Sequence, residues 1–484
     1  MSREERAPLL QQRWSEEGEQ RKQLRIADLS NDENPREWPR WRKMANVAVI
    51  ALMSILSPLV SSMFTPGIAQ IADDLNCSTT AVIGTTTGFV VMLGIGPLLL
   101  APLSETFGRR RIYMICFSIF ALLQIPTALA PNIAFLITIR SVAGFFGSVG
   151  IANGGGTISD MFIPSERAGV FGWYLLGPLL GPTLGPLFGG IIVQRLGWRW
   201  IFWIMTIVCS VNTLAGFFFL RETYAPLILS SKKAEYEAQS SDRDGTKYTY
   251  EGEDTRPLAR KMLDAVKRPP KIFLQPIVAI MAIYQALIFG TTYSIYTNMQ
   301  PIYQDEYGFD TEKVGLLYLG PGLGFLFAVW FLVPRIDSVY KKLTASHNGK
   351  PRPEFRLPMA NIGSVCIPMS LFWFAWTVEK HVHWFASISS TFFYGIGQVM
   401  ILNSTQNYFI DSFEKYAASA IAAGAVFRSV VGGVIPMFAP ALFEKLGYGW
   451  GISTFAFVSL VLAPAPMLFY IFGEHLRERF PVDL

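Results

Sequence analysis

Residues 168–194 read AGVFGWYLLGPLLGPTLGPLFGGIIVQ and contain no aspartate, glutamate, lysine or arginine. A helix needs about 20 apolar residues to cross the ~30 Å hydrocarbon core of a bilayer, so this stretch is long enough to span one. Eight more charge-free runs of similar length occur at 44–72, 75–104, 112–139, 272–304, 314–334, 357–378, 381–410 and 446–473. A water-soluble core has no room for so many wholly apolar segments. The sequence therefore predicts an all-α polytopic membrane protein.

The composition also excludes several classes of protein. Charged residues make up 16% of the chain, against about 25% in soluble domains. No G-x-x-x-x-G-K-[ST] phosphate-binding loop occurs, so ATP-driven pumping has no support in the sequence. The four cysteines and four histidines show no metal-ligand spacing. We expect no enzymatic activity, no cofactor and no metal.

Twelve membrane-spanning helices are predicted, at 45–69, 81–102, 112–131, 133–158, 168–193, 199–220, 273–298, 313–333, 358–378, 383–408, 417–442 and 451–473. An even number of spans places both termini on one side. Of the 41 lysines and arginines, 34 lie on that side and five on the other. Because lysine and arginine concentrate in cytoplasmic loops, both termini are predicted to be cytoplasmic.

The spans divide six and six around one long polar stretch. The predicted parts are a cytoplasmic tail at 1–43, an N-terminal six-helix bundle at 44–221, a cytoplasmic linker at 222–271, a C-terminal six-helix bundle at 272–473 and a cytoplasmic tail at 474–484. The centre of the linker, 240–255, has the composition of a disordered segment. Leu258, Met262 and Val266 recur every four residues among basic residues, which predicts a helix on the anionic membrane surface. A solvated linker is the alternative.

Corresponding loops of the two halves resemble each other. Glu105 precedes Arg109-Arg110 after the second span, as Asp337 precedes Lys341-Lys342 after the eighth. Residues 195–200, RLGWRW, follow the fifth span, and residues 445–450, KLGYGW, follow the eleventh. This repetition predicts two pseudo-symmetric six-helix bundles with a substrate site between them near the membrane midplane.

Glycines and prolines repeat along the fifth span: Gly177, Pro178, Gly181, Pro182, Gly185, Pro186, Gly189 and Gly190. Glycines four residues apart form a bare stripe that another helix can approach closely. Each proline removes a backbone donor and favours a bend. We interpret this pattern as a bending or gating element; a stripe that serves packing alone is the alternative.

Two arginines, Arg140 and Arg428, lie inside the fourth and eleventh spans. A central arginine costs ~2.5–3.5 kcal/mol on insertion scales, so both should face the protein interior. Both are candidates for a functional role, Arg428 in substrate binding. For each, a structural arginine bonded to backbone carbonyls is the alternative.

Uncharged polar residues gather on the first, fourth, seventh and tenth spans. We take Tyr284, Tyr293 and Asn298 on the seventh and Gln398 and Asn403 on the tenth as candidate substrate-binding residues. The same residue types commonly bond helices to one another, which is the alternative for each.

Acidic residues lie at the ends of the spans rather than deep inside them: Asp73, Asp74, Glu105, Asp160 and Asp411. A strongly cationic substrate would need a desolvated carboxylate, so neutral, amphipathic or anionic substrates suit this chain better. A proton carrier must then be an acid at the rim, Asp160 or Glu105.

Several motifs together resemble the major facilitator superfamily, and within it the fungal twelve-helix drug:proton antiporters. Residues 101–110, APLSETFGRR, are similar to the signature G-x-L-x-D-x-x-G-R-R, with alanine for the first glycine and glutamate for the aspartate. Arg140 with Gly144 resembles the fourth-helix R-x-x-x-G motif, a resemblance that implies a role for Arg140 in proton coupling. Residues 181–190 resemble the fifth-helix antiporter motif. Segments typical of fungal members are 34–39, 221–226, 353–357 and 383–384.

This resemblance implies export of lipophilic drugs or secondary metabolites in exchange for protons, usually at the plasma membrane, with a vacuolar membrane as the other location. It implies that Glu105, Arg109 and Arg110 form a charge latch between the halves. The expected partners are a small-molecule substrate, protons and the lipid bilayer, with no nucleic acid, and the expected state is a monomer. Two alternatives remain: a nutrient facilitator or importer on the same fold, and a membrane receptor or sensor without transport.

Overall fold

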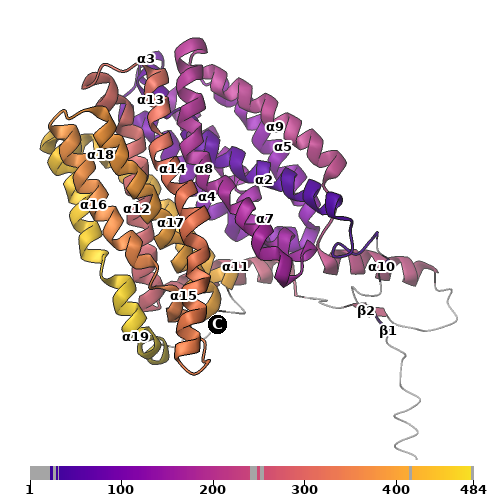
Figure 1. The fold of residues 1–484 in the computed structure, drawn as a ribbon. Helices are drawn as coiled ribbons and strands as arrows, with labels where there is room; N and C mark the ends of the chain where they lie inside the picture. Colours follow the sequence, from indigo (N-terminus) through magenta and orange to yellow (C-terminus); the bar gives the residue numbers. More distant parts are fainter. Residues whose placement is uncertain are drawn as a thin grey trace, which may run out of the picture.

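The computed structural model describes residues 22–24, 29–30, 32–239, 248–250, 256–413 and 417–480. Long helices dominate it (Figure 1). The N-terminal half consists of α2 (Arg40–Met63), the 3-10 turn η2 (Thr65–Gly67), α3 (Ile68–Asp74), α4 (Thr79–Phe107), α5 (Arg109–Ala128), α6 (Ile133–Gly147), α7 (Val149–Met161), α8 (Pro164–Leu196) and α9 (Arg199–Phe219). The C-terminal half consists of α12 (Pro276–Asp305), α13 (Thr311–Leu317), α14 (Leu319–Phe327), the π-helical turn η3 (Ala328–Leu332), α15 (Val333–Ser346), the 3-10 turn η4 (Pro353–Arg356), α16 (Ala360–Glu379), α17 (Trp384–Ser412), α18 (Ala417–Leu462) and α19 (Ala465–Arg479).

Eleven helical segments of the described residues are long and apolar enough to cross a membrane. The twelve predicted spans map onto these eleven because the last two fall within the segment Ala420–Arg479. Gly447 interrupts α18 with φ 73° and ψ 171°, a conformation that favours glycine. After this break the chain turns back along α16: Trp450 contacts Trp376 and Phe457 contacts Phe372, so sequence numbers rise on one helix as they fall on the other. The predicted all-α polytopic fold is confirmed.

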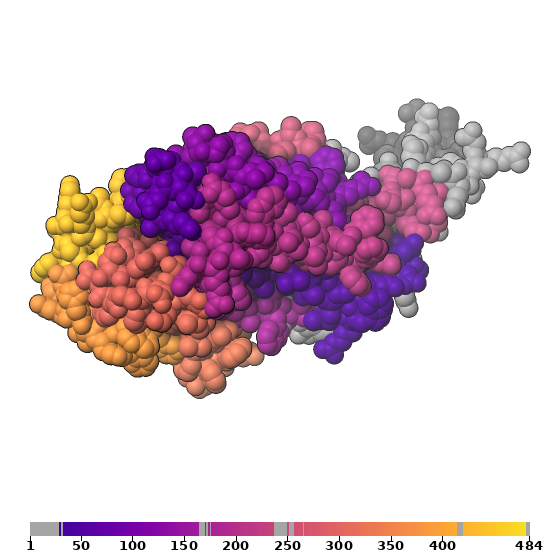
Figure 2. Space-filling model, turned by 90° about the horizontal axis from the view of Figure 1, so that it is seen from above, coloured from indigo at the N-terminus to yellow at the C-terminus, as the bar shows by residue number. Residues whose placement is uncertain are grey.

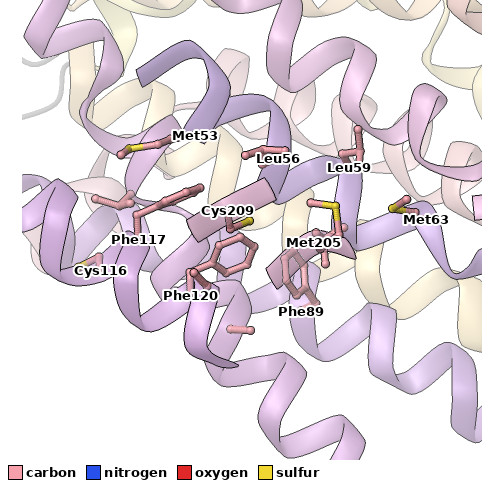
Figure 3. Close-up of a cluster of buried hydrophobic side chains, with 14 of the residues drawn as sticks. Met53, Leu56, Leu59, Met63, Phe89, Cys116, Phe117, Phe120, Met205 and Cys209 are labelled. Carbon is pink, nitrogen blue, oxygen red and sulfur yellow. The ribbon is translucent and has the colours of Figure 1, made fainter. Parts of the chain in front are cut away.

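Apolar side chains that face away from lipid form a separate core in each half. The largest cluster draws its buried residues from 38–220, and Figure 3 shows its centre, where α2, α4, α5 and α9 meet. The side chains labelled there include Met53, Leu56, Phe89, Phe117, Phe120 and Met205. Three further clusters draw their buried residues from 272–469. Viewed from above, the indigo-to-magenta and the salmon-to-yellow parts of the chain lie side by side (Figure 2).

Two helix pairs make the most extensive contacts between the two bundles. In one pair, the Thr87 hydroxyl on α4 donates to the Gly433 carbonyl on α18 at 2.6 Å. In the other, α8 lies against α13, and a Cβ atom on Gly190 would lie 2.7 Å from the Thr311 carbonyl oxygen. Glycine at this point lets two backbones from different halves approach to contact distance.

Helices α10 (Ala225–Gln239) and α11 (Leu258–Phe273) lie across one end of the long helices (Figure 1). We call this the linker end, which holds Arg109, Asp160 and Glu222, and we call the opposite end, which holds Asp74, Arg195 and Gly447, the far end. The predicted helix around 258–266 is confirmed as α11, whereas α10 was not predicted. Most of the predicted disordered centre, 240–255, and more than half of the predicted tail, 1–43, lie outside the described residues. Strand β2 (Tyr248–Tyr250) pairs in parallel with β1 (Lys22–Leu24), a contact that the sequence did not indicate.

Candidate functional site

At the linker end, Arg109 is the centre of a buried polar network. Its Nε lies 3.4 Å from Asp160 Oδ2 and its Nη2 lies 3.5 Å from Glu105 Oε1. Its Nη1 donates to the Ser104 hydroxyl at 2.6 Å. The Asp160 carboxylate also accepts from the Thr223 hydroxyl at 3.3 Å. Asp160 and Glu105, which the sequence singled out as candidate proton carriers, therefore share one guanidinium group, although Glu105 is half exposed and Asp160 is mostly buried.

Glu222 joins this network from the segment that leaves α9. Its carboxylate accepts from the backbone amides of Arg109 at 2.9 Å and Arg110 at 3.1 Å, which are the first two residues of α5. The free amides and the dipole at a helix N-terminus both favour a negative charge there. Gly108, with φ 99°, provides the turn that exposes these amides. The Arg110 side chain points outward and donates to the Phe217 carbonyl.

Replacing Glu222 with alanine should lower the free energy of unfolding by about 1–2 kcal/mol, the usual effect of losing a helix N-cap. The measurement is thermal or denaturant unfolding of the purified protein. Glu474→Gln is the matched control, because its ion pair with Arg352 is exposed and such a pair contributes at most about 1 kcal/mol. Equal stability of Glu222→Ala and the wild type would contradict the capping role.

The C-terminal half has a similar network built around Arg356. Its Nε donates to Asp411 Oδ2 at 2.7 Å, and its Nη1 pairs with Asp337. Asp337 and Asp411 lie on α15 and α17 as Glu105 and Asp160 lie on α4 and α7. The arginine, however, comes from η4 and not from Lys341-Lys342, the bases that the internal repeat placed opposite Asp337. Burial alone would lower the pKa of Arg356, but its hydrogen bonds to Asp411 and Asp337 raise it.

The glycine stripe of α8 faces α2. A Cβ atom would lie 2.5 Å from an Ile55 side-chain carbon at Gly177, 3.0 Å from the Ile55 carbonyl at Gly181 and 2.6 Å from the Leu59 carbonyl at Gly185. At Gly189 it would overlap the Met63 carbonyl oxygen. The close helix approach predicted from the spacing is therefore present, and its partner is α2. The helix continues through Pro178, Pro182 and Pro186.

The opposite side of α8 meets the other half. The Thr183 hydroxyl lies 3.3 Å from the Tyr296 hydroxyl of α12. At the far end, Arg195 forms a bidentate ion pair with Glu312 of α13, with Nη2 3.0 Å from Oε1 and Nε 3.3 Å from Oε2. Thus α8 contacts its own half through glycines and the other half through Thr183, Gly190 and Arg195.

Arg140 lies on α6 with an exposed fraction of 1%. Its Nη2 donates to the Val60 carbonyl at 3.3 Å, just before α2 gives way to η2. The planar guanidinium group sits 4.2 Å from the ring centre of Phe64, and the rings of Phe89 and Phe202 lie slightly farther away. Its Nε has no hydrogen-bond partner.

Arg428 and Tyr293 lie on the other side of the contact between the halves. Arg428 of α18 is 5.2 Å from the ring centre of Phe289, and its Nε is buried without a partner. The Tyr293 hydroxyl on α12 lies 3.1 Å from the Ser61 hydroxyl on α2. Tyr293 is also within electrostatic range of both Arg140 and Arg428. The structure therefore places these three predicted residues in one region at the middle of the molecule.

The other candidate substrate residues are more dispersed. Tyr284 is fully buried in the core of the C-terminal half, and Gln398 accepts from the Thr292 hydroxyl of α12 at 3.3 Å. Asn403 donates to the Val399 carbonyl of its own helix. Asn298 lines a cavity of about 670 Å³ at the far end, between the two halves.

This cavity has an acidic wall. It is lined by Ile68, Ala69, Thr79 and Ile83 from the N-terminal half and, from the C-terminal half, by residues that include Asn298, Gln300, Asp305, Glu306, Glu379 and Glu444.

Some residues in these networks were not expected from the sequence. Glu222 lies in the fungal-type segment 221–226, which carried no assigned role. Ser61 belongs to the polar set of the first span, and its contact with Tyr293 could not be read from spacing. Nothing in the sequence around Glu312 indicated a partner for Arg195.

Comparisons with known proteins find the family that the sequence motifs resemble, and the similarity extends over most of the chain. The sequence profile of the family described as "Major Facilitator Superfamily" matches residues 50–436. "MFS transporter cpaT" of Aspergillus oryzae is 38% identical over 93% of this chain and 91% of its own. "Efflux pump radE" of Floropilus chiversii is 37% identical, over 93% of this chain and 84% of its own. Among solved structures, a D-xylose-proton symporter has a TM-score of 0.65 at 14% identity, over 88% of this chain and 97% of its own, a likeness of fold.

Proposed function

The chain belongs to the major facilitator superfamily and is a membrane transporter rather than an enzyme, and from this premise we propose that it exports small lipophilic drugs or secondary metabolites in exchange for protons. One of its relatives is named an efflux pump, which supports the outward direction. We place it in the plasma membrane as a monomer, with the linker end and both termini in the cytoplasm; a vacuolar membrane is the alternative.

In this proposal the bundles at 44–221 and 272–473 rock against each other around a central substrate site. The observation that carries it is the double contact of α8. Its glycines bind it tightly to α2, whereas Thr183, Gly190 and Arg195 contact the other half. A helix held this way transmits movement at the far end to the centre of its own bundle. The segment 222–271 links the bundles, and α11 lies on the inner membrane surface.

Proton coupling would act through the Arg109 network. Protonation of Asp160 would remove its attraction for the Arg109 guanidinium and leave Glu105 as the remaining acidic partner. The first residues of α5 are joined to Glu222 through the backbone, so they would hold their place while the side chains rearrange. In this way a rim acid would link proton binding to the position of the bundle ends.

Proteoliposomes that contain a pH-sensitive dye test the proposal. A panel of neutral and acidic lipophilic compounds, applied as an outward gradient, should drive protons in the opposite direction. Asp160→Asn should abolish this proton movement and leave substrate exchange in place, whereas Asp411→Asn, the corresponding change in the C-terminal half, should keep both. Movement of protons and compound in the same direction would instead support an importer.

A further inference from the structure

Two positive charges lie in the centre of the molecule, on Arg140, which is buried, and on Arg428, which is partly buried. Among the described residues, no carboxylate forms an ion pair with either arginine, and the titratable group that acts on both, the Tyr293 hydroxyl, is neutral at ordinary pH. At the linker end, by contrast, Arg109 and Arg356 each form an ion pair with an aspartate. An uncompensated charge at this depth is unfavourable and indicates a functional role.

The hydrogen-bonding capacity of these arginines is also largely unused. A guanidinium group has five N–H donors in one plane. Among the described residues, Arg140 makes one long hydrogen bond, to the Val60 carbonyl at 3.3 Å, and the Nε atoms of both arginines have no acceptor. Leaving a buried charged donor unpaired costs more than the hydrogen bond itself contributes. An incoming acceptor of negative charge would satisfy these donors.

The aromatic neighbours of these arginines do not satisfy their N–H donors. Phe64 lies 4.2 Å from the guanidinium carbon of Arg140, and Phe289 lies 5.2 Å from that of Arg428. A ring near a guanidinium stabilises its charge and provides apolar surface, but it supplies no lone pair to the N–H groups. A carboxylate is the ligand group whose two oxygens match a guanidinium fork.

The three polar residues belong to both halves. Arg140 lies on α6, and Arg428 and Tyr293 lie on α18 and α12. Tyr293 reaches across to Ser61 of α2 at 3.1 Å, so this region lies where the halves meet. A ligand held here would contact both bundles at once.

We infer that Arg140, Tyr293 and Arg428 form an anion-binding site, and that the molecules carried are lipophilic acids bound through an ionised carboxylate. The rings of Phe64, Phe89 and Phe289 contact the apolar body of the ligand. The inference rests on the proposed transport function, because it names the class of substrate.

Binding of 1-naphthoate and of its neutral amide, 1-naphthamide, to the full-length protein in lipid nanodiscs tests this inference. The acid should raise the melting temperature, and the amide should have little effect. Because hydrogen bonds to charged groups contribute about 1.5–3 kcal/mol, Arg428→Gln should weaken naphthoate binding by about 10- to 100-fold. Arg428→Lys should retain part of the affinity, and Tyr293→Phe should weaken it less. Arg352→Gln, at an exposed ion pair with Glu474, is the matched control.

The stability of the ligand-free variant separates this role from a structural one. Arg428→Gln removes an unneutralised charge, so the melting temperature without ligand should stay the same or rise; a structural arginine would give a fall. Equal shifts with naphthoate and naphthamide, no shift with either, or unchanged naphthoate affinity in Arg428→Gln would overturn the inference. Because binding is measured without flux, failure of export in vesicles would refute the proposed function and leave this result standing.

Discussion

Replacing Gly185 with leucine should reduce export to the background of empty vesicles. The glycine faces the backbone of α2, where a Cβ atom would lie 2.6 Å from the Leu59 carbonyl oxygen and would also overlap the Ser62 hydroxyl. A leucine there must push α8 away from α2. Overpacking of this kind costs about 1–3 kcal/mol, and the displaced helix no longer fits against α13 and α14. Vesicle efflux of an identified substrate is the measurement.

Two further variants separate packing from movement. Phe188→Leu, on an exposed face of the same helix, should transport normally. Gly190→Ala introduces a Cβ atom 2.7 Å from Thr311 of the other half, so it should slow transport with little loss of thermal stability. Normal export by Gly185→Leu would remove the gating role of the stripe, and a stability loss in Gly190→Ala equal to that of Gly185→Leu would reduce the whole motif to packing.

Arg140→Gln should abolish transport while the protein remains folded in the membrane. The change removes a buried charge that the described residues do not neutralise, and it leaves behind only the Val60 carbonyl, to which glutamine can still donate. Loss of one such hydrogen bond costs about 0.5–1.5 kcal/mol, which a folded transporter tolerates. Transport should stop because the inferred anion-binding site loses Arg140, the positive charge that the N-terminal half contributes to it.

The measurement for Arg140→Gln combines vesicle flux with a melting curve. Arg352→Gln serves as its control, since this arginine forms an exposed ion pair with Glu474 and lies outside the residues proposed to act in transport. Full flux in Arg140→Gln would make Arg140 a structural residue that caps the end of α2.

The membrane-spanning helices were predictable because a segment that crosses the hydrocarbon core must be long and almost free of charge. Charge-free runs gave the spans, and the glycine spacing of the fifth span gave the close approach to another helix. The repeat between 195–200 and 445–450 was also informative: Gly197 and Gly447 have φ values of 89° and 73°, so both loops turn with the same backbone conformation. These features depend on local composition, and a single sequence contains that information.

Partner choice between distant residues was not predictable. Asp337 pairs with Arg356 although Lys341 and Lys342 are nearer in sequence, because η4 places the Arg356 guanidinium between α15 and α17. Glu222 caps α5 from more than a hundred residues away. Charge and spacing identify which residues need a partner, whereas the tertiary arrangement of the helices decides which partner they meet.

The exposed position of the Arg195–Glu312 pair has an energetic consequence. Their side chains are 66% and 34% exposed, and pairs of this kind contribute at most about 1 kcal/mol and are screened by salt. The networks around Arg109 and Arg356, by contrast, each stay within one half. The ionic contribution of this pair to the contact between α8 and α13 is therefore small, and it falls further as the ionic strength rises. If the bundles rock as proposed, a substrate shifts their balance only by the difference in its affinity for the two conformations, and a difference of about 1.4 kcal/mol shifts it tenfold.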